Sequence, residues 1–423
     1  MNRWQKIELG ELCEFIKGET GIAKAPAGPY PLVTTGAERK TCDSYQFDAK
    51  AVCLPTISSA GHGKKSLNYI HYQEGKFALG TILVALIPKD ENQLNAKYLH
   101  TYLFHYKDIL IVPLQKGAAN VSLPIKKVKK IRIPVPPISE QLKLTNLLQN
   151  IDSDYCELLK ENNYQIDLIK KLRQKILQEA IEGKLTADWR AENPDVEPAG
   201  ELLARIRAEK AQLIKDKKIK KQKPLPPIRE EEKPFELPAG WVWCRLGDLI
   251  SISSGDALIL SDMKEGQIPV FGGNGINGYH DDYNTDEVTI TIGRVGAYCG
   301  AVHLTPEYAW ITDNCFRVYY SKRNIDMNYF VLHLKQMELG KMSFKGAQPV
   351  ISGKRVYPLI TQLPSLLEQK AIVAKVEKLF VICDQLETQI TNNKTHAEQL
   401  MQAVLKEAFT QTSEQDEKAA AHA

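Results

Sequence analysis

The sequence predicts an α+β protein with two strand-rich domains that are separated by two long coiled-coil helices, in an internal pseudo-two-fold repeat. Three observations indicate this fold. The two halves of the chain share an ordered set of motifs, and the front part of each half has short strand-like segments between glycine-rich turns. The back part of each half has the periodicity of a long helix. A repeat of this length implies that each half is one structural unit.

The two halves begin alike. Trp4 opens the segment WQKIELGEL and Trp241 opens WVWCRLGDL, and Gly18 and Gly255 follow at the same distance. We interpret both tryptophans as core residues at the start of a domain. Further matches follow at a drifting offset, so the loops of the two front parts differ in length.

The back part of the repeat has a constant length. Nine residues recur at a separation of 228 positions, namely Pro136, Glu140, Gln141, Leu158, Leu172, Gln174, Leu177, Glu179 and Ala180, matched by Pro364, Glu368, Gln369, Leu386, Leu400, Gln402, Leu405, Glu407 and Ala408. The back part therefore holds no insertion or deletion between the two copies.

This fixed-length part predicts a long helix in each half. Apolar residues alternate at spacings of three and four, as in a coiled-coil seam. The predicted seam residues are Leu148, Ile151, Leu158, Leu172, Val376, Leu379, Leu386 and Leu400. Asn162 falls on the same seam, where a polar residue lowers stability but can fix the register. An amphipathic helix on a globular core is the alternative, but such a helix would tolerate slippage.

These patterns divide the chain into six parts. We predict a first domain (1–138), a central helix (139–182), a connector (183–237), a second domain (238–366), a C-terminal helix (367–410) and a disordered tail (411–423). The connector holds a helical piece at 199–214, a lysine run and the segment Pro224-Leu225-Pro226-Pro227. Proline predicts a semi-rigid, exposed connector. Its lysines are either a solvated tether or contacts to phosphate.

The composition excludes several classes. The chain has 423 residues and a net charge of +4, so any nucleic-acid binding depends on local patches. Its eight cysteines have no zinc-site spacing, which favours free thiols in a reducing cytoplasm and no metal. Because no signal core or long apolar run occurs, we expect a cytoplasmic protein without a membrane span.

The motifs of common catalysts are absent. The sequence has no P-loop, no dinucleotide-binding glycine motif, no amino-methyltransferase tetrapeptide and no hydrolase or nuclease signature. In a tandem repeat with a coiled coil, these absences together favour binding over catalysis and predict no catalytic residue and no cofactor in this chain.

Several strings resemble the specificity subunits of type I restriction-modification enzymes. They are IPVPPISEQ (133–141) and LPSLLEQ (363–369) at the two helix starts, LRQKILQEAIEGKL (172–185), LPAGWVW (237–243) and IGRVGAYCG (292–300). The ordered set covers nearly the whole chain. The first domain departs at Ile57-Ser58-Ser59-Ala60-Gly61, where Ser59 stands in place of Arg294, so an arginine role is not carried over to that half.

The resemblance implies a non-catalytic subunit that binds double-stranded DNA. Each front domain would be a target recognition domain, and the two helices would pair antiparallel and hold the domains apart. About 44 helical residues span roughly 65 Å, which limits the separation to about 19 base pairs. The implied target is bipartite, with two specific blocks and a spacer of fixed length.

Side chains in the glycine-rich or polar loops are candidates for reading base edges, because arginine and lysine read guanine while asparagine and glutamine read adenine. In the first domain these candidates are Lys40, Ser58, Ser59, His62, Lys64, Lys65, Lys116 and Asn120. In the second domain they are Asn274, Asn277, Arg294, Tyr298, Lys345 and Gln348. For each one, an exposed loop residue that contacts nothing or only phosphate is the alternative.

Family membership also implies partners. Two modification subunits would bind S-adenosylmethionine and methylate a flipped adenine at N6, and restriction subunits would supply translocation and cleavage with ATP and Mg. The exposed faces of the long helices would dock the modification subunits. The alternatives are the specificity subunit of a methylation-only system and a coiled-coil scaffold that binds proteins, and the scaffold predicts no salt-dependent DNA affinity.

Overall fold

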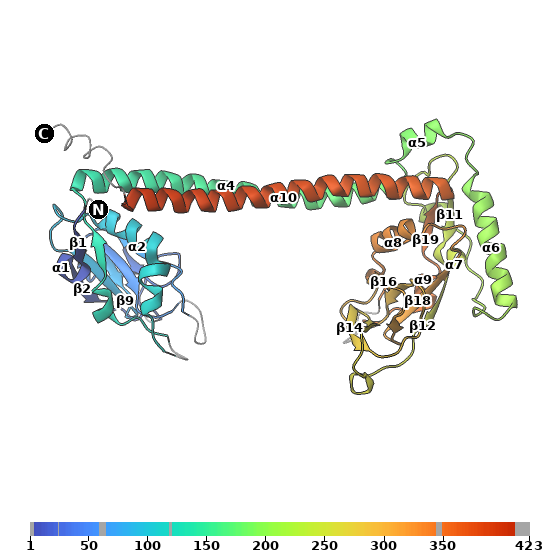
Figure 1. Cartoon of the computed structure of the whole chain (residues 1–423), viewed down its shortest axis with the longest axis horizontal. Helices are drawn as coiled ribbons and strands as arrows, with labels where there is room; N and C mark the ends of the chain where they lie inside the picture. The colour runs from blue at the N-terminus through green and yellow to red at the C-terminus, as the bar shows by residue number, and fades with distance from the viewer. Residues whose placement is uncertain (1–3, 24, 59–64, 118–120, 344–348, 411–423) are drawn as a thin grey trace. The chain divides into compact units, whose positions relative to one another are not determined.

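The computed structural model describes residues 4–23, 25–58, 65–117, 121–343 and 349–410. The chain divides into two compact units, residues 1–164 with 390–423 and residues 165–389. Each long helix contributes one part to each unit. Figure 1 labels many of the elements, which are described below unit by unit.

The first unit contains two four-stranded sheets. One has the order β2 (Cys13–Lys17), β9 (Leu83–Pro88), β6 (Ala51–Pro55), β7 (His71–Gln73), and the other β4 (Lys40–Cys42), β3 (Tyr30–Val33), β8 (Lys76–Leu79), β5 (Phe47–Asp48). Side chains alternate between the two faces of a strand. Cys53 and Ala85 therefore pack with Phe77 and Leu79 of the other sheet.

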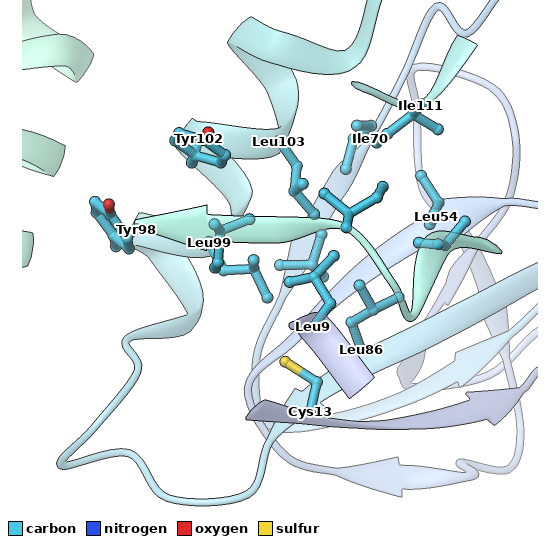
Figure 2. Packing of buried hydrophobic residues seen from close by; sticks show 14 of the residues in the cluster. Leu9, Cys13, Leu54, Ile70, Leu86, Tyr98, Leu99, Tyr102, Leu103 and Ile111 are labelled. Atoms are coloured by element: carbon cyan, nitrogen blue, oxygen red, sulfur yellow. The ribbon is translucent and has the colours of Figure 1, made fainter. Parts of the chain in front are cut away.

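The opposite face of the first sheet carries the main core of this unit. Leu54 and Leu86 pack there against α2 (Ala96–Leu110), which contributes Tyr98, Leu99 and Leu103 (Figure 2). The Asn95 side chain caps α2 by accepting hydrogen bonds from the amides of Lys97 and Tyr98. The core also includes α1 (Leu9–Leu12), and β1 (Lys6–Glu8) pairs antiparallel with β10 (Arg132–Pro134).

The second unit repeats this plan with different strands. One sheet has the order β12 (Ile250–Ser254), β18 (Cys315–Tyr320), β15 (Ile290–Gly293), β16 (Val302–Leu304), and another has β14 (Gly275–His280), β13 (Ile268–Gly272), β17 (Trp310–Ile311). Ile292 and Val318 pack against α8 (Met327–Gln336), which is capped by Asp326. The pair β11 (Val242–Arg245) and β19 (Ile360–Leu363) matches β1 and β10.

The two long helices are α4 (Ile138–Ile181) and α10 (Leu366–Thr410). In the first unit, Leu148 of α4 is buried together with Met401 and Leu405 of α10, and Phe409 packs edge-on against Tyr102. In the second unit, Arg173 of α4 pairs with Asp384 and Glu387 of α10. The helices are antiparallel in each unit, as the resemblance implies.

The predicted seam is right for part of its residues. Leu148 and Val376 are buried, while Ile151, Leu158 and Leu379 are partly buried. The prediction is wrong for Leu172, Leu386 and Leu400, which are 45%, 40% and 65% exposed.

For two of these three leucines, the following residue is less exposed. Arg173, after Leu172, lies over the Phe380 ring with its guanidinium carbon 5.0 Å from the ring centre, and its side chain is 24% exposed. Met401 is buried beside Leu400. A straight helix drifts by about 20° per heptad relative to a strict seven-residue pattern, so inward positions shift by one residue along it.

The connector is not an exposed tether. Its helix α6 (Ala199–Lys215) buries Ala199, Leu202 and Ile206 in the core of the second unit. Further along, Arg245 pairs with Glu232 of the connector at 2.8 Å. The prediction of an exposed connector rested on its proline and lysine content. Burial of the apolar face of α6 instead docks this part of the connector on the second unit. The lysines at 215, 217, 218, 220, 221 and 223 are exposed. The predicted tail at 411–423 lies outside the described residues.

Candidate nucleic-acid interface

Two loops of the first domain meet at the end of β6. Ile57 forms an antiparallel bridge with Ser122, and the Ser58 amide donates to the Val121 carbonyl at 2.9 Å. Ser122 also exchanges two backbone hydrogen bonds with Lys116, at 2.8 and 2.7 Å. The loops that carry the candidates Ser58, Lys65 and Lys116 therefore belong to one small platform.

Three lysines concentrate positive charge on this platform. The charge of Lys116 lowers the pKa of Lys127, and Lys65 acts in the same direction. Like charges near Lys127 disfavour its charged form, which places its ammonium group in a locally positive environment. All three side chains are exposed. Such a cluster attracts the phosphates of a nucleic acid.

The floor of the platform is held by side chains. The Ser58 hydroxyl accepts a hydrogen bond from the Ser66 amide at 3.1 Å. The amide group of buried Gln115 donates to the Ser66 carbonyl at 2.9 Å, which joins the two loops. A ligand at this platform would therefore meet a preformed surface.

The second domain has a corresponding platform. Asn274 and Asn277 are exposed on the hairpin between β13 and β14, beside the loop that holds Arg294 and Tyr298. A side chain at Gly293 would lie 2.4 Å from the Gly273 carbonyl oxygen, so the close approach of the two loops needs glycine. The sequence prediction thus selected four residues that the fold brings to one region.

The guanidinium of Arg294 is held in place by hydrogen bonds from one of its nitrogens. Its Nη1 donates to the Ser254 hydroxyl at 3.1 Å, and its guanidinium carbon lies 5.6 Å from the centre of the Phe316 ring. The side chain is partly exposed. A guanidinium anchored through one nitrogen can present its remaining edge to a base or a phosphate.

The two platforms share their backbone hydrogen bonds. Val295 bridges Val350 as Ile57 bridges Ser122, and the Ile351 amide donates to the Arg294 carbonyl at 2.9 Å. In the first domain the Leu123 amide donates to the Thr56 carbonyl at 2.8 Å. Thr56 is therefore the counterpart of Arg294, and the predicted match of Ser59 with Arg294 is wrong. Loops of unequal length hide this register from a sequence comparison.

Of the other predicted contacts, the structure describes only Lys40. Lys40 is exposed on β4, in the other sheet of the first unit. Six candidates lie outside the described residues, namely Ser59, His62, Lys64, Asn120, Lys345 and Gln348. Sequence reasoning missed Lys127, although the run Lys126-Lys127 with Lys129-Lys130 is a visible basic signal on and after α3 (Ile125–Val128).

Three buried cysteines and the arrangement of metal-binding residue types describe the chemical groups of the fold. Burial raises the pKa of the Cys13, Cys53 and Cys315 thiols to about 12, so these groups stay protonated at neutral pH. Over residues 4–410, apart from the gaps given above, no cluster of three or more His, Cys, Asp or Glu is placed to hold a metal ion. In the same residues, no helix has the length and apolar character needed to cross a membrane.

Comparison with known families agrees with this architecture. Residues 1–168 and 238–394 match the type I restriction modification DNA specificity domain. The chain belongs to this family. The match leaves out the connector and includes both platforms and parts of both long helices.

Curated relatives are specificity subunits of type I restriction enzymes from Escherichia coli. The EcoEI subunit is 30% identical over 294 residues, covering 59% of this chain and 49% of that protein. The EcoAI subunit is 49% identical over 129 residues, 28% of this chain and 21% of that protein. The EcoDI subunit is 26% identical over 96% of this chain and 88% of that protein. The matched regions thus span about half the length of the EcoEI subunit and about a fifth of the EcoAI subunit.

Solved structures show the same fold. The HsdS subunit from Thermoanaerobacter tengcongensis has a TM-score of 0.55 at 15% identity, with 96% of both chains covered. A chain from a structure on complex assembly and conformational transition of the type I R-M system has a TM-score of 0.59, also at 15% identity, with 96% of this chain and 97% of that one covered.

Proposed function

We propose that this chain is the DNA sequence-specificity subunit of a type I restriction-modification system and reads a bipartite target, one half-site with each domain. The observation that carries the proposal is the pair of platforms. Both have the same backbone pairing, but Thr56, Lys65 and Lys116 stand on one and Arg294 and Asn277 on the other. The same scaffold with different side chains suits two readers of different sequences.

The chemistry of the two platforms fits DNA. Lys65, Lys116 and Lys127 supply local charge for phosphate contacts, although the net charge of the chain is only +4. Asn277 and Arg294 supply the amide and guanidinium groups that pair with adenine and guanine edges in the major groove. Phosphate contacts would position each domain, and base contacts would specify the sequence.

The long helices would act as the ruler between half-sites. The two helices match at a separation of 228 positions without insertion or deletion, and they pair antiparallel in each unit. The length of the helix pair is therefore fixed. A spacer set by helix length follows, because each residue adds about 1.5 Å to a helix.

The helices also carry apolar side chains without cover in the described structure. Leu168, Leu172, Val381 and Leu386 are exposed in the second unit, and Leu147 and Leu400 in the first. Exposed apolar groups in both units suit two bound subunits. We propose that these are modification subunits, which bring S-adenosylmethionine, while restriction subunits bring ATP and Mg. This chain would then be non-catalytic.

A half-site test examines the proposal. The chain is co-expressed with its modification subunit, and N6-adenine methylation is measured on a target library with each half-site randomised in turn. Arg294→Ala should relax the second half-site alone, and a mismatch at the affected position should lose its cost of about 1–3 kcal/mol. Lys116→Ala, on the other platform, is the matched control and should leave the second half-site unchanged. Relaxation of both half-sites by Arg294→Ala would contradict one reader per domain.

A further inference from the structure

Glu368, in the first turn of α10, is the centre of a buried polar cluster. Its side chain is 4% exposed, and it accepts four hydrogen bonds. The Thr186 hydroxyl and two nitrogens of Arg190 donate to one carboxylate oxygen, at 2.7, 3.1 and 2.7 Å. The indole nitrogen of Trp241 donates to the other at 2.8 Å.

The donors come from different parts of the second unit. Thr186 and Arg190 follow the end of α4, and the Arg190 guanidinium also donates to the Gly183 carbonyl at 2.6 Å. Trp241 is the residue before β11, where the second domain begins. The cluster therefore joins the end of one long helix, the start of the other and the entry to the domain. We call these four residues, Glu368, Thr186, Arg190 and Trp241, the clamp.

Backbone geometry supports the clamp. Gly183 has a φ of +70°, which favours glycine, and a side chain there would lie 2.6 Å from the Pro238 ring and 3.0 Å from Trp241. The Arg190 guanidinium carbon lies 5.8 Å from the centre of a Trp241 ring. The turn after α4 is thus shaped to bring Arg190 to Trp241 and Glu368.

The first repeat keeps the Glu-Gln pair at its helix start, as Glu140 and Gln141, but the glutamate has different contacts. Gln141 and Gln369 make equivalent hydrogen bonds in the two repeats. Their side-chain oxygens accept from the backbone amides of Asn95 and Asp326, respectively, both at 2.8 Å. Glu140, the counterpart of Glu368, instead pairs with Lys143 at 3.1 Å and has a side chain that is 42% exposed. The glutamine contact is common to both repeats, whereas the two glutamates differ in burial and in partners.

We infer that Glu368 is a positioning residue that sets the direction in which the second domain leaves the two helices, and so the spacing at which the second half-site is read. This inference rests on the proposed function. Burial of a carboxylate costs free energy that its donors offset only with good geometry. Charge-assisted hydrogen bonds are shorter than neutral ones and add geometric specificity as well as free energy, so they restrict the orientation of the groups that they join.

The test uses the full chain in complex with its modification subunits. Methylation rates are measured on duplexes that carry the two cognate half-sites with the spacer at its natural length and one or two base pairs shorter or longer. Wild type should favour the natural spacer by at least about tenfold. Glu368→Gln should reduce this preference to about threefold or less, with the base preference within each half-site unchanged. Glu140→Gln removes the matching charge in the other repeat and should keep the wild-type profile.

Trp241→Phe provides a second variant, because it keeps an aromatic ring and removes only the indole donor, and it should broaden the spacer profile in the same direction. A folded Glu368→Gln or Trp241→Phe complex with the wild-type spacer profile would overturn the inference. Equal broadening by Glu140→Gln would overturn it as well. If wild type methylates without any preference for the half-sites, the proposed function fails, and the role of the clamp fails with it.

Discussion

At the scale of residues, the first platform gathers the positive charges of three lysines in one small region. The positive charges of Lys116 and Lys65 lower the pKa of Lys127 in the free protein. A phosphate beside these lysines would offset that effect. The contribution of these lysines to binding should therefore be electrostatic and independent of sequence.

Lys116→Ala should weaken DNA binding by the complex about equally on cognate and unrelated duplexes. The slope of log affinity against log salt should become shallower by about 0.9 for one lost phosphate contact. Fluorescence anisotropy over a salt series measures both quantities. Lys215→Ala, which removes an exposed lysine of the connector, is the control. A loss confined to the cognate duplex would instead assign Lys116 to base reading.

His333 predicts how the second unit responds to acid. Burial lowers the pKa of His333 to about 4, and its Nε2 contacts the Thr361 hydroxyl. Between the usual pKa of about 6.5 and 4, the unfolded chain binds a proton that the folded chain does not. The free energy of unfolding should therefore fall as pH falls through this window, and this contribution is fully present above pH 6.5.

The loss from this residue amounts to about 3 kcal/mol at most. Urea unfolding at several pH values, for wild type and His333→Gln, isolates this share. The variant should lose less stability between pH 6.5 and 4. Parallel curves for the two proteins would show that His333 is protonated at little cost.

Residue-level prediction from sequence located loops that the backbone brings together, while contact of their side chains with DNA stays a prediction. Asn274, Asn277, Arg294 and Tyr298 were selected for their glycine-rich setting, and the fold places them in one region. It failed where register depends on pairing. The match of Thr56 with Arg294 follows from backbone pairing, and the adjacent string 57–61 suggested a different register, with Ser59 opposite the arginine.

At the scale of elements, the apolar seam of the helix pair contains a buried polar residue, Asn162. Asn162 is 5% exposed on the seam, and its Nδ2 has no hydrogen-bond partner among the described atoms. Its counterpart in the repeat, Ile390, is buried as well. A buried amide of this kind lowers stability but can fix the pairing of two helices.

Asn162→Ile should raise the free energy of unfolding by about 1–3 kcal/mol, because it removes an unsatisfied buried donor. Thermal or urea unfolding of the chain measures the change. Asn163→Ile, at the exposed neighbouring position, is the control and should give no comparable gain. A destabilised Asn162→Ile would mean that the asparagine is satisfied in solution, for example by a bound water.

The outward leucines give a prediction for assembly. Leu172→Glu combined with Leu386→Glu should weaken binding of a modification subunit by at least about tenfold, since each change places a charge in an apolar contact. The pair Gln174→Glu and Gln385→Glu makes the same charge changes at exposed polar positions and should bind normally. Sedimentation velocity of the mixed subunits measures the complex. Unchanged assembly of the leucine variant would exclude this face as the docking surface.

Element prediction succeeded for the long helices because a seven-residue pattern of constant length has one physical solution. It failed for individual seam positions and for the connector. The contact of Arg173 with Phe380 brings one long polar side chain inward, and periodicity alone assigns such a position to leucine. Lysine and proline content hid the apolar face of α6, whose Leu202 and Ile206 are buried.

At the scale of the whole molecule, the helices and the domains should control different properties of the target. Helix length should set the spacer, and the two domains should set the half-site sequences. Insertion of one heptad after Tyr164 in α4 and one after Gln389 in α10 lengthens both helices between the units. Seven residues add about 10 Å, so the spacer should grow by about three base pairs. Both half-site sequences should stay as they are. Methylation of a spacer library measures the shift, and a change in the half-site bases would contradict the ruler.

The central claim is that two domains of one chain read two halves of one DNA target. The most direct test expresses this chain with its modification subunit in a bacterial strain free of other adenine methyltransferases and maps N6-methyladenine over the genome. The account predicts one bipartite motif with a spacer of constant length, and a change in only one half when the residues of the second platform are replaced. A continuous motif, or a methylation pattern unchanged by removal of this chain, would contradict the account.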